Sequence, residues 1–163
     1  MDESEEIKRK QAAIYFDKAH RLQMRGELAD AIINYKRSLA TFPTAEAYTH
    51  LGWTYSMMQR YEEAIEVCEK AIELDPSLGS PLNDIGAYLI EMERWEEAIP
   101  WLEKALTAPG YETPQFAHLN LGRVYEQQGE LPRALEQYDF AMELDPFYRA
   151  AHGAKYALLA RLN

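Results

Sequence analysis

The chain repeats one arrangement of residues four times at a nearly constant spacing. Pro43 and Pro76 are 33 residues apart. Gly52 and Gly86 are 34 apart, and Gly122 follows 36 residues later. Such self-similarity indicates copies of one small structural unit, each of which buries its apolar face on its neighbours. The spacing predicts a repeat region over residues 12–146, divided into units over 12–44, 45–78, 79–114 and 115–148. A polar extension of the first helix (1–11) precedes it, and a C-terminal capping helix (147–163) follows.

Each unit has the pattern of two helices joined by a polar turn. In the second unit, Tyr48, Leu51 and Tyr55 recur at spacings of three and four residues, which places them on one helical face. A second helical pattern begins after Arg60 and ends before Pro76, because proline lacks an amide donor. Small residues recur within both helices, which indicates that the paired helices approach closely.

These residues resemble the signature of the tetratricopeptide repeat (TPR) family over nearly all of the chain. The second unit matches with Tyr48, Leu51, Gly52, Tyr55, Ala64, Ala71 and Pro76, and the fourth with Leu121, Gly122, Tyr125, Ala134, Tyr138, Ala141 and Pro146. The first and third units match more loosely: Lys18 stands where leucine is usual, and Pro109 comes one place early. The resemblance implies an all-α superhelix (α-solenoid) of four helix-turn-helix repeats plus a capping helix. It also implies an adaptor that binds a peptide segment of a partner protein in a concave groove.

The resemblance further implies which residues line that groove. They occupy positions 2, 5, 9, 12 and 13 of each unit, counting the unit's first residue as position 1. The candidate peptide-binding residues are Phe16, His20, Met24, Thr49, Trp53, Met57, Asn83, Ile90, Phe116, Leu119 and Arg123. Trp53 is the expected anchor, because tryptophan is enriched among residues that dominate binding energy. The alternative is that these side chains pack against the next unit or against the acidic N-terminal segment folded back.

The charge distribution predicts the chemistry of the ligand. The net charge is −10, and residues 44–114 carry 14 acidic and 4 basic side chains. Such a surface repels nucleic acid. Glu46, Glu91 and Glu126 beside the groove favour a ligand with basic residues flanking apolar ones. Among the groove positions only Arg123, and partly Asn83, suits a carboxylate, so a C-terminal carboxylate is not the expected ligand.

No arrangement of side chains predicts catalysis, a cofactor or a metal site. His20, His50, His118 and His152 fall in different units, and no two have the four-residue spacing of a helical metal site. Glycine-rich phosphate loops and nucleophile elbows are missing from the sequence. Cys68 lies on an apolar helical face and is expected to be a buried thiol. We therefore expect a protein that is not an enzyme.

The sequence leaves location and assembly open. Without a run of 18 apolar residues it predicts no membrane span. Its acidic start is unlike a secretory signal, so the expected location is the cytoplasm, with a removed signal or lipid anchor as the alternative. The loop from Pro109 to Pro114 resembles one in bacterial outer-membrane TPR lipoproteins that assist type IV pilus assembly, which makes an envelope-assembly role a second hypothesis. Self-association through Trp101 or the final leucines, giving a homo-oligomer, is a third.

Overall fold

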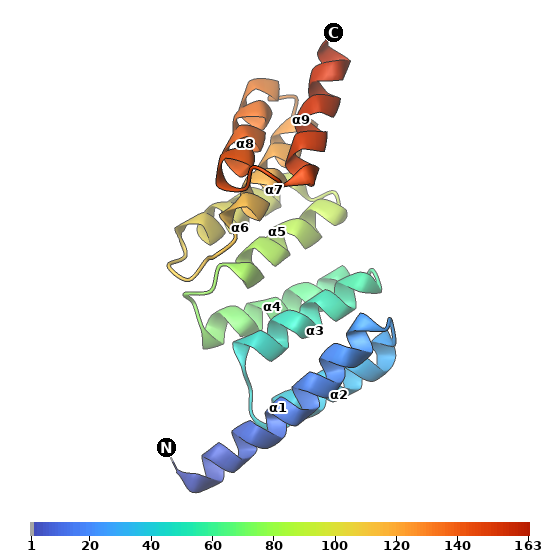
Figure 1. Ribbon diagram of the computed structural model, residues 1–163, viewed down its shortest axis with the longest axis vertical. Coiled ribbons are helices and arrows are strands. Elements are labelled where there is room, and N and C mark those ends of the chain that lie inside the picture. The colour runs from blue at the N-terminus through green and yellow to red at the C-terminus, as the bar shows by residue number, and fades with distance from the viewer. Residues whose placement is uncertain (1) are drawn as a thin grey trace. The chain divides into compact units, whose positions relative to one another are not determined.

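The computed structural model describes residues 2–163, and all regular elements within that range are α-helices (Figure 1). The helices are α1 (Glu3–Met24), α2 (Leu28–Thr41), α3 (Ala45–Met57), α4 (Tyr61–Leu74), α5 (Ser80–Glu91), α6 (Trp95–Thr107), α7 (Pro114–Gln127), α8 (Leu131–Leu144) and α9 (Arg149–Leu162). The predicted all-α class, with four helix pairs and a final helix, is confirmed.

The helices form two compact units. The first contains the described residues up to Pro76, and the second contains Ser77–Asn163. In the first unit α1 pairs with α2 and α3 with α4, while α2 also packs on α3. In the second unit α5 pairs with α6 and α7 with α8, α6 packs on α7, and α9 packs on α8. The first helices of consecutive repeats also touch each other, α1 with α3 and α5 with α7.

A glycine in the first helix of each of three repeats lets the paired helix approach closely. A Cβ atom added at Gly52 would lie 2.8 Å from Cys68 Sγ. One added at Gly86 or Gly122 would overlap the side chain of Leu102 or Tyr138, respectively. The three opposing side chains are fully buried. Glycine is therefore required by packing at these positions, and Cys68 is the buried free thiol that the sequence predicts.

Substituting Gly122 by alanine tests this packing directly. Gly122→Ala should destabilise the fold by about 1–3 kcal/mol, because the rigid Tyr138 ring leaves no room for the methyl group. Gly153→Ala is the matched control: nothing lies within 4 Å of its added Cβ, so the better helix former should stabilise α9 by about 1 kcal/mol. Urea unfolding of both variants measures the difference. Equal effects of the two substitutions would contradict the packing argument.

The turns between paired helices all use one residue in the left-handed backbone region. These residues are Gly26 (φ 79°), Gln59 (φ 59°), Glu93 (φ 58°) and Gly129 (φ 76°). Only glycine adopts this conformation without steric cost. The first and last repeats have glycine there, whereas the two middle repeats hold strained residues.

Gln59→Gly should therefore stabilise the chain. Relief of left-handed strain contributes about 1–2 kcal/mol, and the greater freedom of glycine in the unfolded chain removes about 0.4–1 kcal/mol of that gain. The expected net effect is a rise of about 0.5–1 kcal/mol in the free energy of unfolding. Gly26→Ala should lower it by a similar amount, and thermal or denaturant unfolding measures both. A destabilised Gln59→Gly variant would show that contacts of the Gln59 side chain stabilise the fold by more than its left-handed backbone conformation costs.

The last helix closes the second unit. Leu158 of α9 is fully buried, and Lys155 Nζ lies 2.6 Å from Asp139 Oδ1 of α8. Arg161 also forms an ion pair with Glu126 of α7. Leu162 is exposed, so the final leucines differ in their use: Leu158 packs inside the unit and Leu162 faces solvent.

Candidate functional site

In the first unit, an aromatic cluster forms where α1 meets α3. His50 lies at its centre, with ring centroids 5.0 Å from Phe16, 5.4 Å from His20 and 4.7 Å from Trp53. Trp53 remains 39% exposed and His20 is exposed, whereas Phe16 and His50 are half-buried. The cluster therefore holds Trp53 in place while part of its ring surface faces solvent.

The imidazole of His50 is neutral at physiological pH. Burial, and secondarily the nearby His20, lowers the pKa of His50 from 6.5 to about 4. Its Nδ1 is buried and has no hydrogen-bond partner among the described residues. Both facts fit a ring that acts by packing against Phe16 and Trp53.

A hydrogen-bonded chain extends this surface toward Met57. The hydroxyl of buried Tyr35 donates to Gln23 Oε1 at 2.6 Å, and Gln23 Nε2 donates to Met57 Sδ at 3.7 Å. Burial raises the pKa of the Tyr35 hydroxyl above its usual value, so it stays a donor. Met57 and Met24 are exposed, Met24 by 74% of its surface. Flexible, polarisable methionines adapt to varied apolar ligands.

Beside the aromatic cluster, the first unit has a cleft of about 360 Å³, which we call the Phe16 cleft. Its lining includes apolar Ala13 and Phe16 and the acidic Asp17 and Glu46. Arg9 also lines it, but the Arg9 guanidinium lies 4.7 Å from the Phe42 ring centroid, in a cation–π contact.

The second unit has a cleft of about 440 Å³, which we call the Arg123 cleft. Its lining comprises Ile90, Glu91, Glu93, Trp95, Arg123, Glu126, Gln127, Tyr138 and Ala154. Glu126 Oε2 accepts a hydrogen bond of 2.6 Å from the Tyr138 hydroxyl, and its other oxygen pairs with Arg161. Glu91 and Arg123 are both exposed at the cleft, so a ligand can reach one carboxylate and one guanidinium group there.

Position 5 of the repeat is buried in three of the four units. Thr49, Asn83 and Leu119 are all buried, and only Phe16 at this position is half-exposed. The contacts explain why: position 5 meets position 6 of the following first helix, as Phe16 meets His50 and as Asn83 Oδ1 accepts 3.1 Å from Asn120 Nδ2. Thr49 Oγ1 donates to Ala45 O at 2.8 Å. These three predicted residues therefore offer a ligand little surface.

Position 12 is covered by the second helix of its own repeat. Gln23 faces Tyr35 and Glu126 faces Tyr138 through the hydrogen bonds above, and Ile90 is buried at the equivalent position. In contrast, the predicted residues at positions 9 and 13 are exposed: His20, Trp53 and Arg123, and Met24 and Met57. Phe116, at position 2, is partly exposed and lies edge-on to the Tyr148 ring at 5.4 Å.

Two residues at these surfaces are missing from the sequence prediction. Trp95 lines the Arg123 cleft although it opens a second helix. His50 organises the aromatic cluster although it lies at position 6. The 30-residue separation of His50 from His20, close to the repeat period, is the signal that places these two rings together.

The other histidines make local contacts. His118 Nδ1 lies 2.7 Å from Gln137 Oε1, and His152 Nε2 lies 2.8 Å from Pro146 O. Among residues 2–163, no three His, Cys, Asp or Glu side chains are arranged to hold a metal ion. Over the same range, none of the helices combines the length and apolar character needed to cross a membrane.

Acidification should weaken the fold through His50. Because the folded chain binds this proton less tightly than the unfolded chain does, stability that is present above about pH 6.5 is lost as pH falls toward 4. After allowance for the partial exposure of the ring, we expect a loss of roughly 2 kcal/mol or less. His50→Gln should remove this part of the pH dependence, while His118→Gln should retain it. Denaturant unfolding at pH 7 and pH 5 measures the change in the free energy of unfolding. An equal change in wild type and His50→Gln would contradict the prediction.

Comparison with known proteins places these helices in a wider group. Two family models described as tetratricopeptide repeat match residues 45–78 and 83–149. Sperm-associated antigen 1 of Mus musculus is 36% identical over 81 residues, which are 50% of this chain and 9% of that protein. DnaJ homolog subfamily C member 3 of Bos taurus is 30% identical over 127 residues, 74% of this chain and 23% of that protein. The chain thus spans less than a quarter of the length of either relative.

Solved structures share the fold. PilF of Pseudomonas aeruginosa superposes with a TM-score of 0.85 at 24% identity, covering 94% of this chain and 70% of that chain. At this identity the likeness concerns the fold alone. YrrB, a TPR protein with an unusual peptide-binding site, gives a TM-score of 0.68 at 27% identity, covering 90% of this chain and 75% of that one. The chain is similar to these proteins in sequence pattern and in helical arrangement.

Proposed function

Since the chain belongs to the tetratricopeptide repeat (TPR) family, we propose that it binds a peptide segment of a partner protein on the exposed face of its first helices. As a TPR protein it is a protein-interaction module. The observation that supports peptide binding at this face is that Trp53 is partly exposed while its ring packs against His50. A large side chain held rigidly and open to solvent loses little entropy when a ligand covers it.

The surface around Trp53 supports an apolar contact. Met24 and Met57 are exposed, and Phe16 lines a neighbouring cleft. Contiguous apolar exposure of this kind is typical of interaction sites, whereas single exposed apolar residues are not informative. The aromatic cluster would supply the rigid anchor and the two methionines the adaptable part of the site.

The charges support basic residues beside the apolar part of the ligand. The Phe16 cleft carries Asp17 and Glu46, and the Arg123 cleft carries Glu91 and Glu93 in addition to Glu126, which already pairs with Arg161. Lysine or arginine in the ligand would complement these carboxylates and accelerate association. Arg123 is the single cation in the lining of its cleft, which argues against capture of a C-terminal carboxylate by a cluster of cations. YrrB, with its peptide-binding site, is a structural precedent for peptide binding on this fold.

Trp53→Ala tests the proposed anchor. Peptides selected from a random library on the wild-type protein should carry apolar residues flanked by lysine or arginine. Trp53→Ala should weaken the binding of such a peptide about 30-fold, the effect of losing about 2 kcal/mol at a binding hot spot. Fluorescence polarisation with a labelled peptide measures the affinity. Amidation of the peptide's C-terminus should leave it unchanged.

Trp101→Ala is the matched control for this experiment. Trp101 is a half-buried tryptophan of α6 that lines neither the Phe16 cleft nor the Arg123 cleft. This variant should bind like wild type. Unchanged affinity of Trp53→Ala, or selection of acidic peptides, would rule out the proposed site.

A second candidate function is envelope or pilus assembly in bacteria, favoured by the loop from Pro109 to Pro114. Gly110 N donates to Ser77 O at 2.8 Å, and the half-buried Tyr111 side chain packs directly on Gly79. The loop is thus an ordered element of the second unit and offers a defined surface. Fractionation of the source cells tests this function, which requires the protein in the envelope fraction. Recovery in the cytosol alone would support the cytoplasmic alternative.

A further inference from the structure

The C-terminal end of α8 and the turn after it expose three apolar side chains, of which Phe140 also contacts the His118 ring of α7 at 5.3 Å. Phe140 and Leu144 are four residues apart on α8, which places them on one side of the helix, and Phe147 lies in the turn that follows the end of α8 at Leu144. All three are exposed, and Phe147 is 89% exposed. The residues that follow the other repeat-ending prolines are Thr44, Ser77 and Gly110. A phenylalanine in this exposed turn therefore has a reason outside the packing of its own repeat. We call these three residues the α8 stripe.

The turn holds Phe147 in a fixed place, and carboxylates flank it. Phe147 N donates to Asp145 Oδ1 at 3.1 Å, and Tyr148 N donates to Asp145 O at 3.1 Å. His152 Nε2 lies 2.8 Å from Pro146 O. Glu136 and Glu143 of α8 are exposed beside the stripe. The stripe is thus an ordered apolar projection with Glu136, Glu143 and Asp145 near it and one exposed cation, Arg149, two residues after Phe147.

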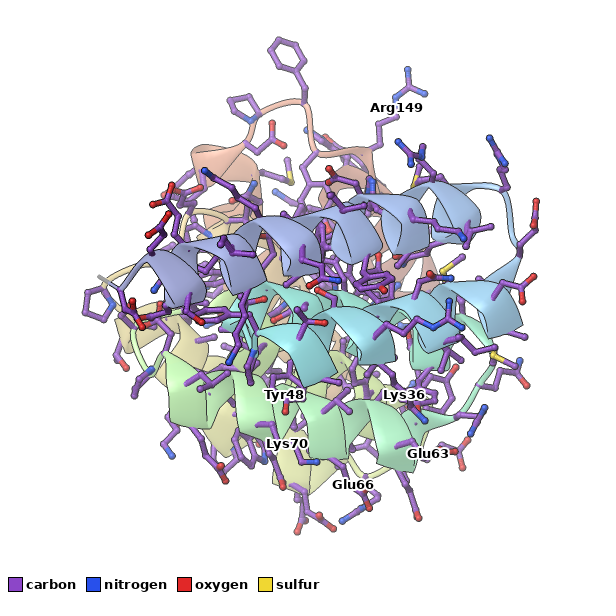
Figure 2. All side chains as sticks on the ribbon, turned by 90° about the horizontal axis from the view of Figure 1, so that it is seen from below. Lys36, Tyr48, Glu63, Glu66, Lys70 and Arg149 are labelled. Carbon is purple, nitrogen blue, oxygen red and sulfur yellow. The ribbon has the colours of Figure 1, made fainter. Side chains whose placement is uncertain are left out.

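The first unit carries a groove of about 400 Å³ between α2 and α4, with α3 as its floor. We call it the outer groove. Its lining comprises Lys36, Leu39, Tyr48, Leu51, Tyr55, Glu63, Glu66, Val67 and Lys70. Figure 2 labels Lys36 of α2, Tyr48 of α3 and Lys70 of α4, which contribute to this lining. None of these residues lines the Phe16 cleft or belongs to the aromatic cluster around His50.

Two lysines give the outer groove a positive rim. Lys36 Nζ lies 5.9 Å from the ring centroid of Tyr55, and Lys70 Nζ lies 5.9 Å from that of Tyr48. Glu63 is already neutralised, because it accepts two hydrogen bonds of 2.6 Å from Arg60. Arg60 itself stacks on Tyr55 at 4.8 Å. Among the lining residues, this leaves one carboxylate, Glu66, against the two ammonium groups of Lys36 and Lys70. Leu39 and Val67 give the groove apolar walls.

We propose that the α8 stripe of one copy of this chain binds in the outer groove of a second copy. Phe147 and Leu144 supply apolar side chains for the Leu39, Val67 and tyrosine surfaces, and Glu143 and Asp145 supply the carboxylates that the two lysines favour. The chain as a whole carries a charge of −10, whereas the lining of the outer groove sets two lysines against two carboxylates, one of which is bound by Arg60. The matching acidic and apolar element occurs in the same sequence, which is why a second copy is the occupant.

The proposed contact is heterologous, since the stripe and the groove are different surfaces. Each bound copy leaves one free stripe and one free groove, so association continues beyond a dimer unless the rotation closes a ring. A contact of this small size is expected to be weak. It goes beyond the proposed peptide binding, because the two functions share no residues.

Two variants that each disable one half of the contact test the proposal. Phe147→Ser removes the stripe's tip and places serine where Ser77 stands in an earlier turn. Lys36→Glu with Lys70→Glu reverses the charge of the groove rim. Wild type should at least double its weight-average mass between roughly 10 µM and 1 mM, as measured by sedimentation velocity and light scattering. Each variant alone should remain monomeric over this range. Circular dichroism melts establish that both are folded, and Lys36→Gln with Lys70→Gln, which should weaken association, replaces the charge reversal if that variant unfolds.

Mixing the two variants gives the decisive result. The Phe147→Ser protein keeps a working groove and the Lys36→Glu/Lys70→Glu protein keeps a working stripe, so an equimolar mixture should form one-to-one dimers and nothing larger. Trp101→Ala should associate like wild type and controls for unspecific apolar contact. Three results would overturn the proposal: wild type that stays monomeric at about 1 mM, variants that associate as wild type does, or a mixture that stays monomeric.

Discussion

The close contact between the two helices of each repeat determines how the remaining surface is used. At Gly52, Gly86 and Gly122 the second helix comes within van der Waals distance of the first helix's backbone. The small residues that face these helices, Ala64, Ala98 and Ala134, are completely buried. Because so little side chain separates the backbones, the larger side chains of the first helix are left for contacts with neighbouring helices and with solvent. The surface of the first helices that a ligand can reach is therefore the part that these packing contacts do not cover.

One side chain of the second helix, the one that packs against the first helix at this contact, determines whether position 12 of the first helix is available to a ligand. The equivalent residues are Tyr35, Cys68, Leu102 and Tyr138. Each tyrosine brings a hydroxyl that must be satisfied when buried, and position 12 of the first helix supplies the acceptor, Gln23 or Glu126. Where leucine replaces tyrosine, position 12 is the buried Ile90. In these three repeats the two positions therefore change together and position 12 packs against the second helix, whereas in the second repeat Ser56 at position 12 donates to Trp53 O of its own helix.

The sequence predicted the helices, their pairing and the role of the glycines, because these depend on periodicity and on steric size within one repeat. It predicted Trp53, His20 and Met24 as surface residues because positions 9 and 13 lie on the side of the first helix opposite its packed face, and in the structure these side chains keep exposed surface although Trp53 and His20 also contact His50. It could not separate positions 5 and 12 from these, since a helical wheel contains no information about the next helix. Phe16 and Asn83 share position 5, and only the structure shows that this position contacts position 6 of the following repeat, at His50 and Asn120. Trp95 was missed for the same reason: its access to the Arg123 cleft depends on the tertiary packing of helices.

Charge connects the proposed ligand site and the proposed self-association, although they use different residues. Ten negative charges in excess oppose the approach of two copies, but at physiological ionic strength this repulsion is screened beyond about 8 Å. At contact distance, local complementarity decides, and there two lysines meet the carboxylates beside Phe147. A basic ligand bound at the acidic clefts would lower the net charge of each copy and so reduce the remaining repulsion. If both proposals hold, ligand binding therefore favours assembly, and by linkage assembly favours ligand binding, through electrostatics alone.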